Sequence, residues 1–226
     1  MKTRGYAALS AKSNLVSYEF NRRDLGEHDV ALDISYAGIC HSDIHQVAEE
    51  WGPAIFPMVP GHEIAGVVTS VGSKVSKFKA GDRVVGECVI GQEHFGFSIS
   101  GAMAEFFIAK ADWLHKLPEN VSWTQGALVE PFSCGYYATV RADNMDASDT
   151  VAVFGAGPIG LGVIAASAAK GARVIVIEPS ADRAKVALSL GADLVIDPTK
   201  ENTKDAVMDA THGVGATIVM DASGRP

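Results

Sequence analysis

Two short segments of the sequence carry side chains that could bind a metal ion. Cys40 lies in the segment 38–45 (GICHSDIH), and His62 lies in the segment 60–63 (PGHE). A set of cysteine, histidine and carboxylate ligands would suit zinc with one position left open for water or substrate. Cysteine is also a common small core residue, and a single histidine is more often structural. These residue types alone therefore leave a metal site and a packed core as alternatives.

A glycine-rich segment, 155–160 (GAGPIG), could bind the phosphates of a dinucleotide. It follows an apolar run and opens an alanine-rich stretch, which is the strand–turn–helix context that the G-x-G-x-x-G pattern requires. Gly155 would permit the tight turn, Gly157 would let the backbone approach a pyrophosphate, and Gly160 would allow close packing of helix on strand. We expect Pro158 and Ile159, at the start of the helix, to complete this cofactor site. The alternative is a domain of similar fold that binds another nucleotide-bearing ligand or none.

Glu178 is the acid that should choose between the two nicotinamide cofactors. It ends the next apolar run, roughly 20 residues after the glycines, where a carboxylate bonds the adenosine ribose hydroxyls. A carboxylate there would repel the 2′-phosphate of NADP, so NAD is favoured. Arg183 lies close by in the sequence and leaves some use of NADP open.

The second part of the chain must position the glycine segment, and its pattern is that of alternating strands and helices. We expect strands at 150–154, 173–177, 194–196 and 216–220, and helices at 159–170, 181–190 and 204–211. Gly171 and Gly191 stand where glycines end helices. Unbroken apolar strands alternating with helices are typical of a parallel sheet that is covered on both faces.

The first part of the chain has a different pattern of short apolar runs, broken by glycine, proline and charged residues. The runs at 30–34, 65–72 and 83–85 predict strands of an antiparallel or barrel-like unit. We therefore expect two domains, residues 1–145 and residues 146–226. The fold class is α/β.

The two metal-binding segments and the glycine segment together resemble the zinc-dependent medium-chain alcohol and polyol dehydrogenases, over essentially the whole chain. The segments 41–46 (HSDIHQ) and 59–63 (VPGHE) are similar to the cinnamyl-alcohol and aldehyde-reductase branch. The segment 128–133 (LVEPFS) is more similar to the sorbitol and threonine dehydrogenases. The resemblance implies a GroES-like, β-rich catalytic domain followed by a partial, doubly wound Rossmann domain.

The same resemblance implies the members of a catalytic zinc site. Cys40 and His62 would be zinc ligands, and Glu130 would stand where the polyol branch places an acid. Glu63 would be a carboxylate that can enter or leave the coordination sphere. Asp43 would hold the ring of His62 by its other nitrogen. The alternatives are a buried structural carboxylate at Glu130 and an ordinary turn cap at Asp43.

The resemblance also implies a route for the proton that alcohol oxidation releases. Ser42 would take the proton from the substrate and pass it through the cofactor ribose, and His45 would deliver it to solvent. A hydroxyl can accept and donate at once, and histidine titrates near neutrality. His41 would lie near the cofactor pyrophosphate. The alternative for His45 is an ordinary surface histidine.

Two departures from the family pattern affect what can be expected. The lobe of four cysteines that often holds a structural zinc would follow Gly86, where the segment 87–94 (ECVIGQEH) offers only Cys88, so we expect that site to be absent. The chain ends at the segment 221–226 (DASGRP), which resembles a strand end partway through the Rossmann domain. We therefore expect a C-terminally shortened dehydrogenase, and the exposed strand edges leave a homo-oligomer open.

Composition excludes several other classes of protein. The formal net charge of −8 argues against nucleic acid or anionic membrane as the main partner. No apolar run is long enough to span a membrane, and the N-terminus has no secretory signal. The three cysteines make a poor disulfide framework and favour the cytoplasm.

The sequence is compatible with three functions. The first is a zinc-dependent oxidoreductase that acts with NAD on a small alcohol, polyol or aldehyde. The second is a catalytically incomplete dehydrogenase that only binds dinucleotide or pairs with other chains. The third is a metal-free quinone reductase, which Cys40, His62 and Glu130 argue against because such an enzyme has no use for metal ligands.

Overall fold

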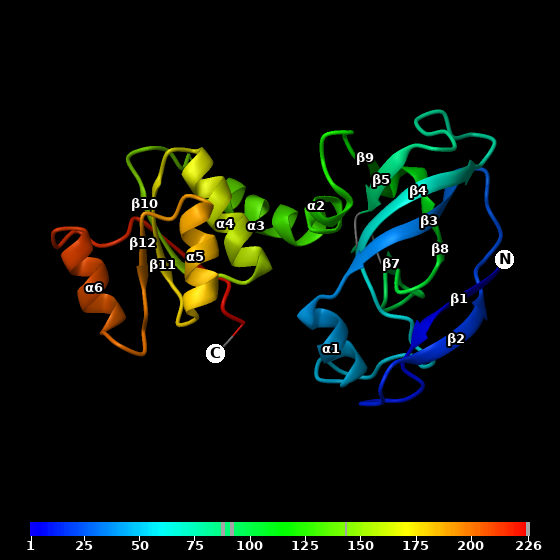
Figure 1. Ribbon diagram of the computed structural model, residues 1–226, viewed down its shortest axis with the longest axis horizontal. Helices are drawn as coiled ribbons and strands as arrows, with labels where there is room; N and C mark the ends of the chain where they lie inside the picture. The colour runs from blue at the N-terminus through cyan, green and yellow to red at the C-terminus, as the bar shows by residue number, and fades with distance from the viewer. Residues whose placement is uncertain (87–88, 91–92, 143, 225–226) are drawn as a thin grey trace. The chain divides into compact units, whose positions relative to one another are not determined.

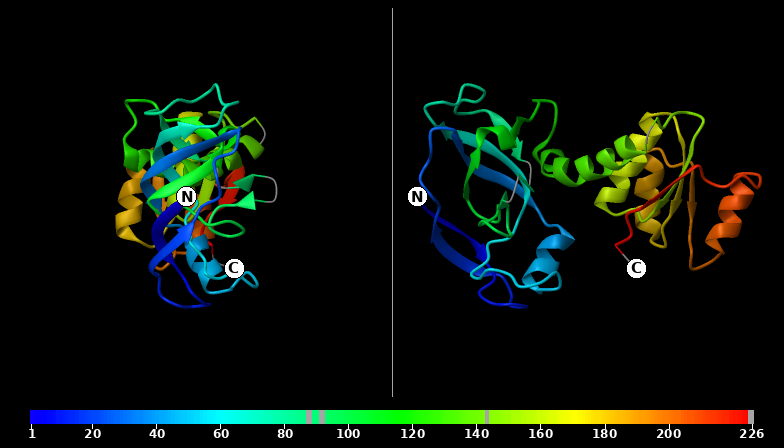
Figure 2. Two further views of the ribbon diagram at one scale, coloured as in Figure 1. Left: turned by 90° about the vertical axis from the view of Figure 1, so that its right-hand side faces the viewer. Right: turned by 180° about the vertical axis from the view of Figure 1, so that it is seen from behind.

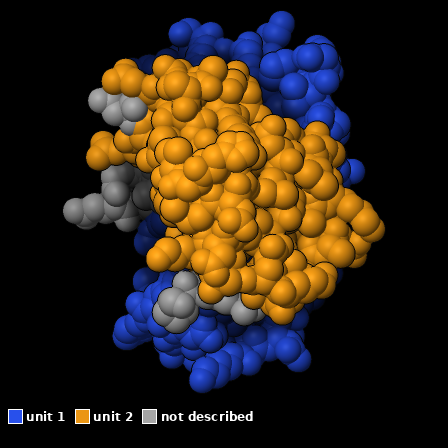
Figure 3. All heavy atoms as spheres, turned by 90° about the vertical axis from the view of Figure 1, so that its left-hand side faces the viewer, with its two compact units in different colours: residues 1–130 blue, residues 131–226 orange. Residues whose placement is uncertain are grey.

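The computed structural model describes residues 1–86, 89–90, 93–142 and 144–224. The chain forms two compact units, Met1–Glu130 and Pro131–Pro226, which Figure 3 colours separately. In the part of the chain that is described, no helix has both the length and the apolar character that a membrane crossing needs. Cys88, on which the expectation about the structural zinc site depends, lies outside the described residues.

A five-stranded antiparallel sheet forms the centre of the first unit, with its strands in the order β8-β3-β4-β5-β9 (Figures 1 and 2). The strands are β3 (Asp29–Gly38), β4 (Glu63–Val71), β5 (Arg83–Gly86), β8 (Phe106–Lys110) and β9 (Leu114–Lys116). The smaller elements of this unit are β1 (Lys2–Ala7), β2 (Val16–Asn21), β6 (Val89–Ile90), β7 (Glu93–His94), a short 3-10 helix (Ala111–Trp113) and α2 (Trp123–Ala127). Leu32, Ile64 and Phe107 belong to one core cluster and are almost fully buried. The predicted β-rich first part is confirmed.

The pairing of β3 with β4 brings the two candidate metal-binding segments together. The strands are antiparallel, and Gly38 at the end of β3 lies opposite Glu63 at the start of β4. Cys40 follows β3 and is the N-cap residue of α1 (His41–Val47), while His62 directly precedes β4. Residues that are far apart in the sequence therefore meet at one end of the sheet.

A four-stranded parallel sheet forms the second unit, with its strands in the order β12-β11-β10-β13. Its elements are β10 (Thr150–Phe154), α4 (Pro158–Ala169), β11 (Arg173–Ile177), α5 (Ala181–Ser189), β12 (Leu194–Ile196), α6 (Thr203–Ala210) and β13 (Ile218–Asp221). Figures 1 and 2 show α4 and α5 on one side of this sheet and α6 on the other. The strand order reverses between β10 and β13, and such a switch point is where open α/β sheets bind their ligands. The predicted Rossmann-type second part is confirmed.

Helix α3 (Val129–Arg141) was not predicted from the sequence. Its aromatic and β-branched residues, together with Pro131 and Gly135, are weak helix formers. A Cβ atom at Gly135 would lie 2.5 Å from the backbone oxygen of Ile159, so glycine lets α3 pack directly on α4. Because of this tertiary contact α3 belongs mostly to the second unit, and the chain divides between Glu130 and Pro131, whereas the boundary expected from the sequence follows residue 145.

Candidate metal and dinucleotide sites

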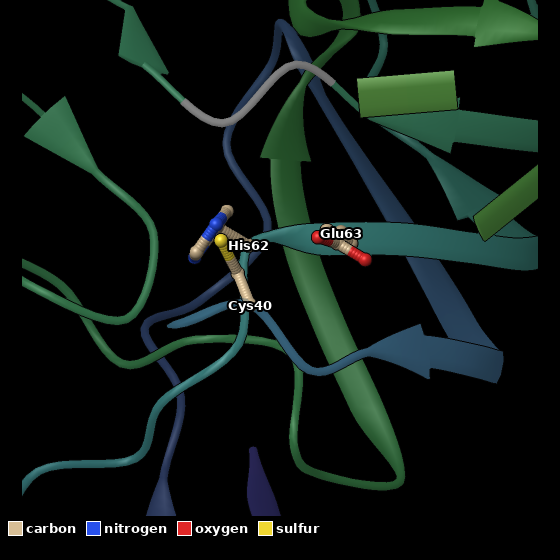
Figure 4. Close-up of side chains that lie close together, drawn as sticks. All are labelled: Cys40, His62 and Glu63. Carbon is tan, nitrogen blue, oxygen red and sulfur yellow. The ribbon is translucent and has the colours of Figure 1, made fainter. Parts of the chain in front are cut away.

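Three side chains with metal-binding atoms gather at the end of the sheet in the first unit. A cysteine Sγ, a histidine ring nitrogen and a carboxylate oxygen, from Cys40, His62 and Glu63, all lie within 4.8 Å of one another. His62 and Glu63 are buried, and Cys40 is half-buried. Figure 4 shows the Cys40 sulfur beside the His62 ring, with Glu63 at the start of β4.

Asp43 connects the two segments that carry these side chains. Its Oδ2 accepts a hydrogen bond from the backbone N–H of Cys40 at 3.0 Å, and its Oδ1 accepts one from the backbone N–H of Gly61 at 2.8 Å. His62 Nδ1 lies 3.3 Å from Asp43 Oδ1, an ion-pair distance without hydrogen-bond geometry, and has no other partner among the described residues. The carboxylate is 3% exposed, so solvent does not compete for these bonds.

The electrostatics of Cys40 and His62 favour a negatively charged sulfur next to a positive charge. Burial lowers the pKa of His62, but the neighbouring Asp43 carboxylate and the Cys40 sulfur outweigh burial and raise it to about 10. The hydrogen bond from His62 lowers the pKa of the Cys40 thiol below its ordinary value, and a bond with Ser42 adds to this effect. The contact between the sulfur and the imidazole contributes to both shifts, and Asp43 adds a larger contribution to that of His62.

Two carboxylates face the same region. Burial is the largest cause of a raised pKa at Glu63, and together with the charges of Glu130 and Asp43, which outweigh the opposing charge of His62, it brings the pKa to about 7. Glu130, in the first turn of α3, is half-buried and is coupled by its charge to Glu63. Within the described residues, the cluster of atoms within 4.8 Å contains Glu63 and not Glu130.

The donor set fits a zinc ion. Thiolate, imidazole and carboxylate are the ligands that zinc prefers in proteins. Because His62 Nδ1 faces Asp43, the Nε2 atom is left for a metal, which is the carboxylate–histidine arrangement that orients zinc-binding imidazoles. A divalent cation would replace the proton that His62 otherwise holds beside the sulfur.

Helix α1 presents the residues that were predicted to carry a proton. Ser42 Oγ lies 3.4 Å from Cys40 Sγ, which places the hydroxyl next to the candidate metal ligands. His45 Nδ1 is hydrogen-bonded to the carboxylate of Glu50. The ring of His45 lies 5.0 Å from the rings of both His41 and Trp51. The predicted residues are therefore on one helix, with Ser42 at the candidate metal site and His45 against a carboxylate at the surface.

His94 and Phe97, which were not predicted from the sequence, also face this site. The rings of His94 and Phe97 lie 3.9 Å apart, and each ring centroid lies 5.8 Å from that of His62. The charges of Glu130 and Asp43 act on His94 as well. His94 ends a two-residue strand and Phe97 lies in the turn after it, so no helical or strand periodicity could have indicated their position.

The glycine segment of the second unit forms the turn from β10 into α4. Gly155 has a φ of 89°, a conformation that glycine adopts without strain. A Cβ at Gly160 would lie 2.0 Å from the backbone oxygen of Gly155, whereas a Cβ at Gly157 would meet nothing within 4 Å. Pro158 is the first residue of α4, and Ile159 is exposed beside it. The turn is thus closely packed at Gly160 and open at Gly157.

The carboxylate of Glu178 is buried and holds this turn. Its Oε2 accepts from the backbone N–H of Ala156 at 2.9 Å, and its Oε1 accepts from the backbone N–H of Ser180 at 2.8 Å. Arg183 lies 3.7 Å from Oε2 and is largely exposed. Glu178 therefore orients the glycine turn, in addition to any contact with a ribose. This structural role could not be predicted from its position in the sequence.

Comparisons with known proteins agree with both halves of the structure. The family model for the alcohol dehydrogenase GroES-like domain matches residues 26–119, and the model for zinc-binding dehydrogenases matches residues 158–226. The chain is 35% identical to a D-arabitol-phosphate dehydrogenase of Enterococcus avium, over 86% of the chain and 61% of the relative. It is 38% identical to an NADP-dependent alcohol dehydrogenase C of Mycobacterium bovis, over 83% of the chain and 62% of the relative.

A solved structure extends this likeness to the fold. The crystal structure of 2R,3R-butanediol dehydrogenase from Bacillus subtilis matches with a TM-score of 0.85 and 31% sequence identity, covering 99% of this chain and 71% of the other. The chain thus spans less than two thirds of the length of the two relatives named above. The family models, the sequence identity and the fold agree, and the chain belongs to the zinc-binding medium-chain alcohol and polyol dehydrogenase family.

Proposed function

We propose that this protein is a zinc-dependent oxidoreductase that transfers hydride between a small alcohol or polyol, or the corresponding aldehyde or ketone, and NAD(H). The observation that supports the proposal most directly is the cluster of Cys40, His62 and Glu63 within 4.8 Å. Three donor types that suit zinc rarely meet at a buried position by chance, because an unpaired carboxylate is costly to bury.

The roles of the individual residues follow from their positions. A bound zinc ion would supply a Lewis acid for the substrate oxygen, and a bound nicotinamide would supply the hydride acceptor. Cys40 and His62 would hold the ion together with an oxygen of Glu130 or Glu63. Ser42 Oγ, next to the Cys40 sulfur, would accept the proton of the substrate hydroxyl.

A residue of α1 would release the proton, and residues of α1 and of the glycine turn would bind the cofactor. His45 would release the proton to solvent, and its hydrogen bond to Glu50 would orient the ring. His41 and the turn of Gly155, Gly157, Pro158, Ile159 and Gly160 would bind the pyrophosphate. The buried negative charge of Glu178 would disfavour a 2′-phosphate, so we propose NAD, with Arg183 offsetting part of that charge.

The experiment that tests this function follows the formation of reduced nicotinamide by zinc-loaded protein with NAD and with NADP. Small alcohols and polyols are supplied as substrates. We expect alcohol-dependent NADH formation that is lost in Cys40→Ala and in His62→Ala, while both variants still bind NADH. Cys134→Ser is the matched control, because Cys134 is an exposed cysteine of α3 outside the metal cluster. Full activity in either alanine variant would show that the proposed metal mechanism is wrong.

A further inference from the structure

His94 is a polar side chain at the candidate metal site that the proposed mechanism does not use. It lies at the end of β7, is half-buried, and packs its ring edge against Phe97 at 3.9 Å. Its ring centroid lies 5.8 Å from that of His62. The His94 ring is therefore close to the position that an ion held by His62, and a substrate oxygen on that ion, would occupy.

The hydrogen bonding of His94 determines which of its nitrogens is available. Nδ1 lies 3.2 Å from the backbone oxygen of Phe95. A carbonyl oxygen only accepts, so the Nδ1 atom must carry the hydrogen of the neutral ring. The Nε2 atom is then the acceptor of the ring, and the hydrogen bond of the ring to a described residue is made by Nδ1.

Aromatic rings also lie on this side of the candidate metal site. Phe97 lies 5.8 Å from His62 and stacks with Trp51 at 6.4 Å. Such rings can contact the carbon chain of a substrate, but they cannot satisfy a hydroxyl group. Beside them, Nε2 of His94 is an acceptor suited to a hydroxyl that the metal does not bind.

We propose that His94 is a specificity-determining residue whose Nε2 accepts a hydrogen bond from the hydroxyl next to the reacting carbon. The preferred substrates would accordingly be vicinal diols and polyols, and simple alcohols would bind less well. A site that hydrogen-bonds a substrate hydroxyl discriminates against the analogue that lacks it, because its own polar group is left unpaired. This inference rests on the proposed function, since it places the substrate at the metal.

The test compares two substrates that differ by one hydroxyl, butane-2,3-diol and butan-2-ol. The protein is loaded with Co²⁺, and each compound is titrated while the visible absorption of the metal is recorded, which measures binding without turnover. His94→Phe keeps the ring packing on Phe97 and removes Nε2. We expect it to raise the Kd of the diol roughly tenfold and to leave that of butan-2-ol within about twofold.

Two further variants separate hydrogen bonding from packing. His94→Gln restores an acceptor, and we expect it to recover most of the diol affinity. His28→Phe makes the same substitution at an exposed histidine of the first unit and should change neither Kd. Equal weakening of both compounds by His94→Phe, or an unchanged diol Kd, would overturn the role of His94. Failure of the unsubstituted protein to show a cobalt spectrum would instead contradict the proposed function itself.

Discussion

At the scale of single residues, Asp43 determines how the two candidate zinc ligands meet. One carboxylate accepts from the backbone of Cys40 and from the backbone of Gly61, and its Oδ1 also faces the ring of His62. Each of these bonds restricts a ligand-bearing segment before any metal binds. A buried carboxylate with these partners makes the site rigid, and rigid sites bind metal with less loss of conformational freedom.

The Asp43→Asn variant tests this role. The amide nitrogen of asparagine cannot accept a hydrogen, so one of the two backbone bonds must be lost whichever way the side chain turns. We expect the Kd for zinc to rise about 10- to 100-fold, measured by competition with a chromophoric chelator. Asp33→Asn makes the same change at an exposed position of β3 and should leave the affinity unchanged. A folded Asp43→Asn protein that binds zinc as tightly as its parent would rule out the positioning role.

Cys40, His62 and Glu63 could be proposed from the sequence because the short motifs that contain them resemble those of a known family, whereas their residue types and spacing alone left a packed core as an alternative. It could not indicate His94, because a short strand has no periodicity and the contact with His62 depends on the tertiary fold. The two hydrogen bonds that Glu178 accepts from Ala156 and Ser180 could not be predicted either, because both donors are backbone N–H groups and leave no signal in the sequence.

At the scale of elements, the turn between β10 and α4 shows why the glycines differ in function. The site of a Cβ at Gly160 is occupied by the Gly155 backbone, whereas the site at Gly157 is open. Gly157 has a φ of −75° and a ψ of −178°, an extended conformation that alanine also adopts. Gly160 is therefore required for packing, and Gly157 leaves space that a ligand can occupy.

This difference predicts opposite effects of two alanine substitutions. Gly157→Ala should leave the melting temperature unchanged and raise the Kd for NADH at least about tenfold, because its methyl group occupies the space for the pyrophosphate. Gly160→Ala should destabilise the fold by about 1–3 kcal/mol through overpacking. Thermal unfolding and NADH fluorescence titration measure the two effects. Parent-like NADH binding by Gly157→Ala would contradict the assignment of this turn to the dinucleotide.

Asp29 connects β3 to its neighbours in the first unit. Its side chain is 1% exposed and forms ion pairs with Arg23 and with Lys110, the latter at 3.3 Å, and it accepts from the backbone N–H of Gly26 at 2.6 Å. Burial raises the pKa of Asp29, but these partners outweigh burial and lower it from 3.8 to about 2. The ionised group therefore favours the folded state.

The resulting stability depends on pH with a definite sign. Asp29 should contribute about 2 kcal/mol at and above about pH 4, and this contribution should disappear as the pH falls to about 2. Asp29→Asn should accordingly lower the melting temperature near neutral pH, with the difference from the parent narrowing in acid. Asp24→Asn, at an exposed neighbouring acid, serves as control. A difference that stays constant down to about pH 2 would contradict the assigned pKa.

The elements themselves were predicted unequally. The strands and helices from Thr150 to Ala210 agree with their predicted ranges to within a residue at most ends, because apolar runs and terminal glycines mark them locally. Helix α3 was missed because its aromatic and β-branched residues and Gly135 are weak helix formers, while its packing on α4 depends on the tertiary fold. Local sequence patterns therefore predicted the helices and strands whose ends are marked by their own residues. They did not predict a helix whose stability depends on packing against a neighbouring element.

At the scale of the whole molecule, the two units carry different parts of the proposed chemistry. The candidate metal ligands Cys40, His62, Glu63 and Glu130 all belong to the first unit, and the glycine turn with Glu178 belongs to the second. Metal binding and dinucleotide binding can therefore be measured separately on the same protein. The metal site, on which the proposed reaction depends, can therefore be tested first and by itself.

The most direct test of that site is the zinc content of the purified protein, determined by elemental analysis. We expect about one zinc ion per chain in the parent, and close to none in Cys40→Ala and in His62→Ala, with circular dichroism confirming that the variants remain folded. Cys134→Ser should retain the zinc of the parent. A parent protein that holds no zinc after reconstitution, or alanine variants that hold as much zinc as the parent, would contradict the assignment of Cys40 and His62 as metal ligands.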